Sequence, residues 1–190
     1  MNHPDTNQSA PDALPSDFFT RPTLTVAREL IGKQFIFHDE SRWQALEINE
    51  VEAYDGMNDK ACHAHVGRTK RSEVMFLPGG IWYVYLCYGI HWLANLVTGP
   101  EDYPAAVLIR GAGRFDGPGK LTKAVGMTGK INRSPVSPDS GFYVADAPAV
   151  PKSHIQRTPR IGIDYAGPVW AKKPYRFVLS RPKKNRIKSP

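Results

Sequence analysis

The sequence contains few cysteines, no long apolar run and, near its C-terminus, no acidic residue. The two cysteines, Cys62 and Cys87, cannot form a disulfide framework or a zinc site made of cysteine alone. No apolar segment approaches the ~20 residues that a membrane-spanning helix needs, so no membrane association is expected. Residues 1–16 are polar and proline-rich and lack an apolar signal core. This stretch predicts a flexible leader on a protein that stays inside the cell, either cytoplasmic or nuclear.

Basic residues outnumber acidic ones by 25 to 18, and the formal net charge is +7. The distribution of this excess is uneven, because no acidic residue follows Asp164 while eight lysines and arginines do. Such a block attracts polyanions through counterion release. A merely solvated tail is the alternative interpretation. We expect residues 183–190 to form a basic tail.

The length of 190 residues suits one domain with a substantial core. Leu24, Ala27, Leu30 and Ile31 recur at helical spacing, and Gly32 is a suitable stop. A second, short helix is expected from Leu121. Strands are expected at 33–40, 43–54, 104–110 and 141–147 and in a hairpin within 82–95, whereas 128–160 is otherwise loop-rich. These patterns predict one α+β domain over residues 17–182, with a mainly antiparallel curved sheet, short helices and a protruding β-hairpin.

The segment EVEAY, residues 50–54, brings two carboxyl groups and a phenol together. By the two-residue period of a strand, Ile48, Glu50, Glu52 and Tyr54 are predicted to share one face. A carboxylate beside aromatic rings can hold and deprotonate a water molecule. A solvated strand face is the alternative, and Glu50 and Glu52 compete for the role of base.

The segment CHAH, residues 62–65, offers Cys62, His63 and His65 as metal ligands. No second cluster of matching spacing exists in the sequence. We therefore expect no metal and no cofactor, although a metal hydrolase that uses His63 and His65 stays a minor alternative.

The segment GPGK, residues 117–120, resembles a phosphate-binding loop without meeting the Walker pattern. Arg114 stands where that motif needs glycine, and Leu121 stands where it needs serine or threonine. What remains is a glycine turn before a helix, with Gly119 and Lys120 as a modest anion site. Such a site suits a nucleic-acid phosphate, and a plain turn is the alternative.

The segment WYVYLCYGIHWLAN, residues 82–95, predicts a hairpin that bends at Tyr88 and Gly89. Packing in the core explains Tyr83, Tyr85 and Trp92, because hairpin arms favour aromatic residues. It does not explain Tyr88, whose turn position exposes the ring. Glycine at the bend keeps the tip slim enough to enter a groove.

The loop at 55–72 adds Arg68, Lys70 and Arg71 beside the carboxylates. Basic groups, exposed aromatic rings and an acid together are typical of enzymes that act on an extruded nucleobase. Among these basic groups, we expect Arg71 to contact the DNA backbone together with Gly119 and Lys120.

Several segments in this order resemble the 3-methyladenine (alkyladenine, or N-methylpurine) DNA glycosylase family. The resemblance extends over nearly the whole chain from about residue 17, and its segments are VARELIGK (26–33), EVEAYDGMNDKACH (50–63), GRTKRSEVMFLPGGIWYVYLCYGIHWLANLV (67–97), AAVLIRG (105–111), GPGKLTKAVGM (117–127), PRIGIDYAG (159–167) and KPYRF (173–177). It implies a monomeric DNA repair hydrolase that flips alkylated or deaminated purines out of duplex DNA and cleaves the N-glycosidic bond.

The resemblance also implies roles for individual residues. Glu52 matches the general base, and Arg110 matches an arginine that positions the attacking water and the nucleotide. The base pocket is matched by Tyr54, His63, Tyr85 and Asn95. Tyr88 matches the intercalating wedge. No lysine stands at a matched catalytic position, so hydrolysis without strand cleavage is expected; a non-catalytic binder of damaged or bent DNA is the alternative.

Overall fold

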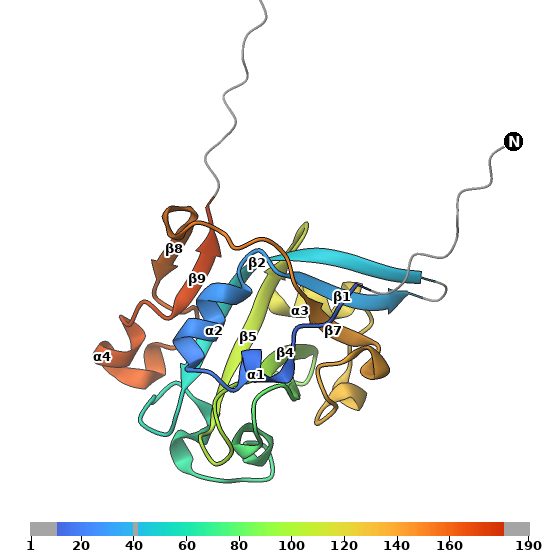
Figure 1. The fold of residues 1–190 in the computed structure, drawn as a ribbon. Coiled ribbons are helices and arrows are strands. Elements are labelled where there is room, and N and C mark those ends of the chain that lie inside the picture. The colour runs from blue at the N-terminus through green and yellow to red at the C-terminus, as the bar shows by residue number, and fades with distance from the viewer. Residues whose placement is uncertain (1–10, 40–41, 181–190) are drawn as a thin grey trace, which may run out of the picture.

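One antiparallel sheet organises the chain in the computed structural model, which describes residues 11–39 and 42–180 (Figure 1). Its order is β3-β4-β5-β2-β1-β7; β6 pairs with β5, and β9 lies between β2 and β8. The strands are β1 Gln34–Asp39, β2 Arg42–Asp55, β3 Trp82–Cys87, β4 His91–Val97, β5 Ala105–Ala112, β6 Phe115–Asp116, β7 Phe142–Ala145, β8 Ile155–Thr158 and β9 Arg176–Leu179. The 14-residue strand β2 connects all parts of the sheet, since it pairs with β1, β5 and β9.

Short helices surround this sheet, and α1 and α2 lie in front of it in Figure 1. The α-helices are α1 Ser16–Phe19, α2 Thr23–Leu30, α3 Pro118–Ala124 and α4 Gly167–Ala171. The 3-10 helices are η1 His63–Val66, η2 Glu73–Phe76, η3 Gly129–Ile131, η4 Pro138–Ser140, η5 Lys152–His154 and η6 Asp164–Ala166. The predicted stripe of α2 is confirmed for Ala27 and Leu30, which are buried together with Val26, whereas Leu24 is only partly buried and Ile31 is buried just after the helix ends.

The core divides into a main cluster and two smaller ones. The main cluster joins α1 and α2 to the sheet through side chains such as Phe19, Leu30 and Trp82. A second cluster lies around η1, η2 and the β3–β4 hairpin, and a third contains Ala61. Tyr54 packs against both smaller clusters. Packing on two sides therefore fixes the ring of Tyr54.

The predicted fold class is confirmed: the molecule is a single α+β domain with a curled antiparallel sheet. Three strands were not predicted, β6, β8 and β9, and β8 lies within residues 128–160, where only one strand was expected. In β8, Gln156 and Arg157 are both exposed, so the strand has no alternating apolar pattern to reveal it. Its pairing with β9 creates it instead.

The chain contacts the domain before residue 17, where we expected order to begin. Ala13 forms a β-bridge with Ala145, and Leu14 is buried in the main cluster. The tyrosine hydroxyl of Tyr143 donates to the carbonyl of Pro11. Most of the predicted leader and the predicted basic tail at 183–190 lie outside the described residues.

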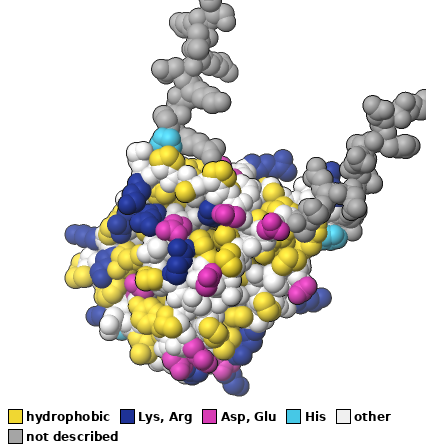
Figure 2. Space-filling model, in the orientation of Figure 1, with side chains coloured by type: hydrophobic (Ala, Val, Ile, Leu, Met, Phe, Trp, Pro, Cys, Tyr) yellow, Lys and Arg dark blue, Asp and Glu magenta, His cyan; other side chains and the backbone are white. Residues whose placement is uncertain are grey.

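The surface in the view of Figure 1 carries charges of both signs among apolar side chains (Figure 2). Lysine and arginine side chains gather on the left of this face, in the region where Figure 1 draws β8 and β9. Among the helices that the structure describes, none is long and apolar enough to cross a membrane.

Candidate active site

Glu52 lies in β2 with its side chain fully buried. Three donors reach its carboxylate. The backbone N–H of Ile161 donates to Oε1 at 2.7 Å, and the hydroxyl of Tyr54 donates to Oε2 at 2.9 Å. The guanidinium of Arg110 approaches Oε2 at 3.4 Å from β5. A buried carboxyl group that receives such donors is held in one orientation, as a general base must be.

Two β-bulges between β2 and β5 create this arrangement. The pairing shifts on both sides of Glu50, which leaves one extra residue on each strand, Asn49 in β2 and Arg110 in β5. The prediction that Ile48 shares a face with the glutamates is therefore wrong. Ile48 lies in the main core with Val51, because the extra residue reverses the alternation of side chains.

The bulge in β5 brings Arg110 to the carboxylates. Its Nε donates to Oε1 of Glu50 at 2.7 Å, and Nε of Arg176 in β9 donates to the same oxygen at 2.7 Å. Glu50 thus connects two arginines, whereas Glu52 has only the longer contact with Arg110. The two glutamates that the sequence left in competition have different surroundings.

These surroundings move the two pKa values in opposite directions. Burial raises the pKa of Glu52, and the favourable contacts with Arg110, Ile161 and Tyr54 do not offset it. Burial also acts on Glu50, but hydrogen bonds from Arg176 and Arg110 outweigh it and lower the Glu50 pKa. A higher pKa makes Glu52 the stronger base of the two.

A pocket opens beside Glu52, and the structure brings all four predicted pocket residues into its lining. Tyr54 comes from β2, His63 from η1, Tyr85 from β3 and Asn95 from β4. The full lining is Tyr54, Ala61, His63, Met75, Tyr83, Tyr85, Asn95, Ala106 and Tyr165. Glu52 is not itself among the lining residues, and Tyr54, which lines the pocket and donates to Glu52, connects the pocket to the carboxylate.

The histidine and tyrosine rings of the pocket contact one another. His63 meets Tyr85 edge-on with ring centroids 4.7 Å apart, and Tyr85 lies 5.1 Å from Tyr83. Nδ1 of His63 is 2.8 Å from the hydroxyl of Tyr83. Burial, with the positive charge of Arg71 as a second cause, lowers the pKa of His63 to about 4. His63 is therefore neutral at pH 7.

Asn95 is almost completely buried at the pocket wall. Its Nδ2 donates to the carbonyls of Tyr83 at 3.1 Å and of Leu93 at 3.4 Å. Both donors of the amide group are thereby committed to the backbone, which fixes the side chain.

Tyr165 is a pocket residue that we did not predict. It lies in η6, is largely exposed, and its hydroxyl donates to the carbonyl of Ala61 at 3.3 Å. No periodicity in the sequence predicts this position, because Tyr165 reaches the pocket by a tertiary contact with Ala61, which lies more than 100 residues earlier in the chain. It falls within PRIGIDYAG, one of the segments that carry the family resemblance.

Tyr88 stands at the tip of the β3–β4 hairpin and is 91% exposed. Tyr88 and Gly89 have φ values of 51° and 72°, and the N–H of Ile90 donates to the carbonyl of Cys87. Two successive positive φ values with this hydrogen bond are those of a type I′ turn. A tyrosine is strained in this conformation, and packing of the exposed ring does not offset the strain, so the fold alone does not explain tyrosine at this position.

The three residues predicted to contact the DNA backbone lie in different settings. Arg71 stacks over Tyr85, with its Cζ 4.5 Å from the ring centroid. Gly119 lies in α3 against His91, where a Cβ would come within 3.0 Å of that side chain. Lys120 is exposed and pairs with Asp116. Glycine at 119 therefore has a packing reason.

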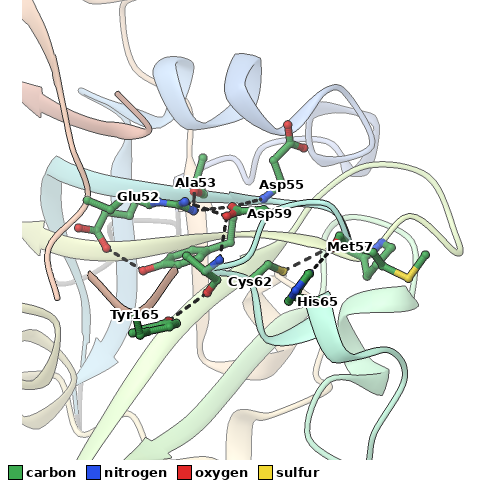
Figure 3. A network of polar contacts seen from close by, with 12 residues as sticks. Glu52, Ala53, Asp55, Met57, Asp59, Cys62, His65 and Tyr165 are labelled. Atoms are coloured by element: carbon green, nitrogen blue, oxygen red, sulfur yellow. Dashed lines mark hydrogen bonds and ion pairs between the residues drawn. The ribbon is translucent and has the colours of Figure 1, made fainter. Parts of the chain in front are cut away.

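The candidate metal ligands Cys62, His63 and His65 do not converge. The thiol of Cys62 points to the carbonyl of Pro104, whereas Nδ1 of His65 contacts the carbonyl of Met57 (Figure 3). His63 contacts Tyr83 instead. Within residues 11–39 and 42–180, no group of three or more His, Cys, Asp or Glu side chains could hold a metal ion.

Comparison with known proteins gives consistent matches over most of the chain. A family model described as Methylpurine-DNA glycosylase (MPG) matches residues 17–115 and 113–183. A relative from Myxococcus xanthus is 44% identical over 177 residues, covering 86% of this chain and 88% of the relative. One from Methanocella arvoryzae is 45% identical over 184 residues (86% and 90%), and one from Legionella pneumophila is 42% identical over 174 residues (87% and 93%). All three bear the provisional name 3-methyladenine DNA glycosylase.

Proposed function

This chain belongs to the methylpurine-DNA glycosylase family, a family of DNA repair hydrolases, and on that premise we propose that it flips damaged purines out of duplex DNA and hydrolyses their N-glycosidic bond. One observation carries the proposal. The buried carboxylate of Glu52 touches Tyr54, and Tyr54 lines an aromatic pocket. In this proposal the pocket receives a flat base, and the carboxylate holds the attacking water beside Tyr54. We further propose that the protein acts as a monomer.

The pocket suits an alkylated purine because it offers the faces and edges of several aromatic rings. Alkylation at N3 or N7 gives the base a positive charge, which weakens the glycosidic bond and favours stacking on electron-rich rings. Tyr54, His63 and Tyr85 form the walls in this proposal. Asn95, held rigidly by its two hydrogen bonds, crowds the 2-amino group of guanine and so discriminates against the normal base.

Glu52 is the general base in this mechanism, and Arg110 orients the water and the nucleotide. The carboxylate accepts a proton from water as the water oxygen bonds to C1′ of the sugar, and the base departs with the electron pair of the broken bond. Glu52 also stabilises the oxocarbenium-like charge of the sugar, as carboxylates do in glycoside hydrolysis. The Glu50 carboxylate is less basic, because Arg176 and Arg110 hold it in the ionised form.

Tyr88 enters the duplex in this proposal, at the space that the extruded nucleotide leaves. A protruding ring can fill that gap and offset part of the few kcal/mol that unstacking costs. Its exposure at the tip of a hairpin supports the role. Arg71, Gly119 and Lys120 are proposed to contact the backbone, the glycine through its N–H group.

The decisive experiment compares Glu52→Gln with its matched control Glu50→Gln on a duplex that carries an alkylated purine. Glu52→Gln is expected to bind this duplex with an affinity close to wild type while free base release falls by about 10²- to 10⁴-fold. Glu50→Gln is expected to retain measurable release. Release that survives Glu52→Gln and disappears with Glu50→Gln would transfer the role of base to Glu50.

The same experiment distinguishes the enzyme from a non-catalytic binder of damaged DNA. Wild-type protein that binds the alkylated duplex tightly and releases no base in a single-turnover assay would favour the binder. An abasic site that stays uncleaved after release would support hydrolysis without strand cleavage.

A further inference from the structure

Asp59 and Arg160 form an ion pair whose two side chains are fully buried. Nη1 and Nη2 of Arg160 donate to Oδ2 and Oδ1 of Asp59 at 2.5 and 2.8 Å, respectively. The same carboxylate accepts the backbone N–H groups of Asp55 at 3.1 Å and of Ala61 at 3.0 Å. Figure 3 displays this network between Glu52 and the loop that follows β2. Four donors therefore hold one carboxylate in a single orientation.

Arg160 connects this carboxylate to β2. Its Nη1 donates to the carbonyl of Ala53 at 2.8 Å. Its Cζ stands 4.7 Å from the ring centroid of Tyr54 and 5.3 Å from that of Tyr175. The guanidinium thus contacts the ring that lines the pocket and the strand that carries Glu52. The chain at residue 160 cannot move without moving these contacts.

The residue that follows, Ile161, supplies the shortest hydrogen bond to Glu52. Its N–H donates to Oε1 at 2.7 Å, whereas its side chain is half exposed. The contact with Glu52 is therefore made by the backbone, and its position depends on the anchoring of Arg160. Asp59 acts on the other side as well, because its bond to Ala61 orders the turn that leads into the pocket wall.

We propose that the Asp59–Arg160 pair is a positioning device for Glu52, which acts through the backbone N–H of Ile161 and the ring of Tyr54. The inference rests on the proposed role of Glu52. A buried ion pair contributes little net stability compared with apolar residues of the same volume, so stability alone does not explain its presence. The pair instead contributes geometry, because it holds the N–H group of Ile161 and the ring of Tyr54 in fixed positions relative to the carboxylate of Glu52.

Several charged and titratable groups face Glu52 from the elements around it. Glu50 and Tyr54 come from β2, and Arg110 comes from β5. Arg160 belongs to the segment after β8, and Arg176 of β9 acts through Glu50. Removing the Ile161 donor leaves these groups in place and deletes one hydrogen bond to the ionised carboxylate. The pKa of Glu52 then rises, and the acid limb of base release moves to higher pH.

The first test compares Ile161→Pro, which lacks the N–H group, with the matched control Ile161→Ala, which retains it. Single-turnover base release is measured between pH 4 and 8 on an alkylated duplex, per folded molecule, with folding checked by circular dichroism. We expect Ile161→Pro to lose about tenfold or more in rate and to shift its acid limb upward. Ile161→Ala should stay within about twofold of wild type. A proline variant with the rate and pH profile of the alanine variant would overturn the proposal.

The second test removes both charges together, because one buried charge left alone can unfold the protein. In Asp59→Asn combined with Arg160→Gln, two neutral amides replace the ion pair. We expect the rate to fall by about tenfold or more while affinity for a duplex with an abasic site changes by less than about threefold. An unchanged rate and acid limb in this double variant would refute the positioning role, including where Ile161→Pro fails to fold. If the double variant fails to fold but Ile161→Pro folds, the comparison of Ile161→Pro with Ile161→Ala decides whether the pair positions Glu52. If the double variant and Ile161→Pro both fail to fold, the contacts are purely structural and the positioning role is refuted.

These results are separable from failure of the proposed function. Wild-type protein that releases no base from any alkylated duplex would contradict the glycosylase activity itself. Wild-type release that is matched by Ile161→Pro and by the double variant would contradict only the positioning role.

Discussion

Replacing Tyr88 by asparagine should strengthen the fold and weaken the action on DNA. The ring is 91% exposed and its φ is 51°, so the fold loses little by its removal. Asparagine tolerates this left-handed backbone conformation better than tyrosine does. A variant that is more stable but acts less well on DNA would show that Tyr88 serves DNA binding rather than packing.

The expected size of each effect follows from the turn. The left-handed conformation costs roughly 1–2 kcal/mol for most L-residues, and we expect Tyr88→Asn to recover about 1 kcal/mol of unfolding free energy. For a chain of this size that corresponds to a rise of about 2–4 °C in Tm. Stacking of an aromatic ring on a base contributes about 1–3 kcal/mol, so the equilibrium for base flipping should weaken by about 5- to 150-fold.

Thermal melting measures the first effect, and fluorescence of a reporter base beside the lesion measures the second. Tyr88→Phe is the matched control, because it keeps the ring and loses only the hydroxyl. It should retain wild-type flipping. A flipping equilibrium that Tyr88→Asn leaves unchanged would refute the wedge, and a fall in Tm of several degrees would refute the conclusion that the ring packs on nothing.

Three more predictions follow from charge. Base release should decline toward acid with a midpoint above pH 4.5, because only the carboxylate form of Glu52 accepts a proton and burial raises its pKa; a pH–rate profile flat down to pH 4 would contradict this. Arg160→Ala should lower the unfolding free energy by about 3–5 kcal/mol in denaturant titrations, since it leaves Asp59 charged and buried; a change below about 1 kcal/mol would contradict it. Arg71→Gln should raise the rate for cationic lesions relative to neutral ones by about threefold or more, because the guanidinium 4.5 Å from the Tyr85 ring centroid repels a cationic base stacked on the opposite face; the proposed backbone contact of Arg71 acts on both lesion classes alike, so equal changes for both would contradict the electrostatic effect.

Local features of the fold could be predicted because short stretches of sequence encode them. The spacing of Leu24, Ala27 and Leu30 suffices for α2, since a helix needs only its own apolar stripe. The turn at Tyr88 and Gly89 likewise depends on neighbours in sequence. Strand β8 lacked such a signal, and it exists because β9 supplies its hydrogen bonds.

The sequence by itself determined the fold class, the family and the residues available for chemistry, because EVEAY and the aromatic hairpin are contiguous motifs. The residue pattern alone left Glu50 and Glu52 in competition, although the family resemblance favoured Glu52, and strand periodicity put Ile48 on the wrong face. Only the tertiary structure shows how the surroundings of the two glutamates differ and why Ile48 faces the core, since register shifts between β2 and β5 reverse the alternation of side chains and arginines from two other strands hold Glu50. The contact between Arg160 and Asp59 spans 101 residues of sequence, and no local pattern encodes a distance of that kind.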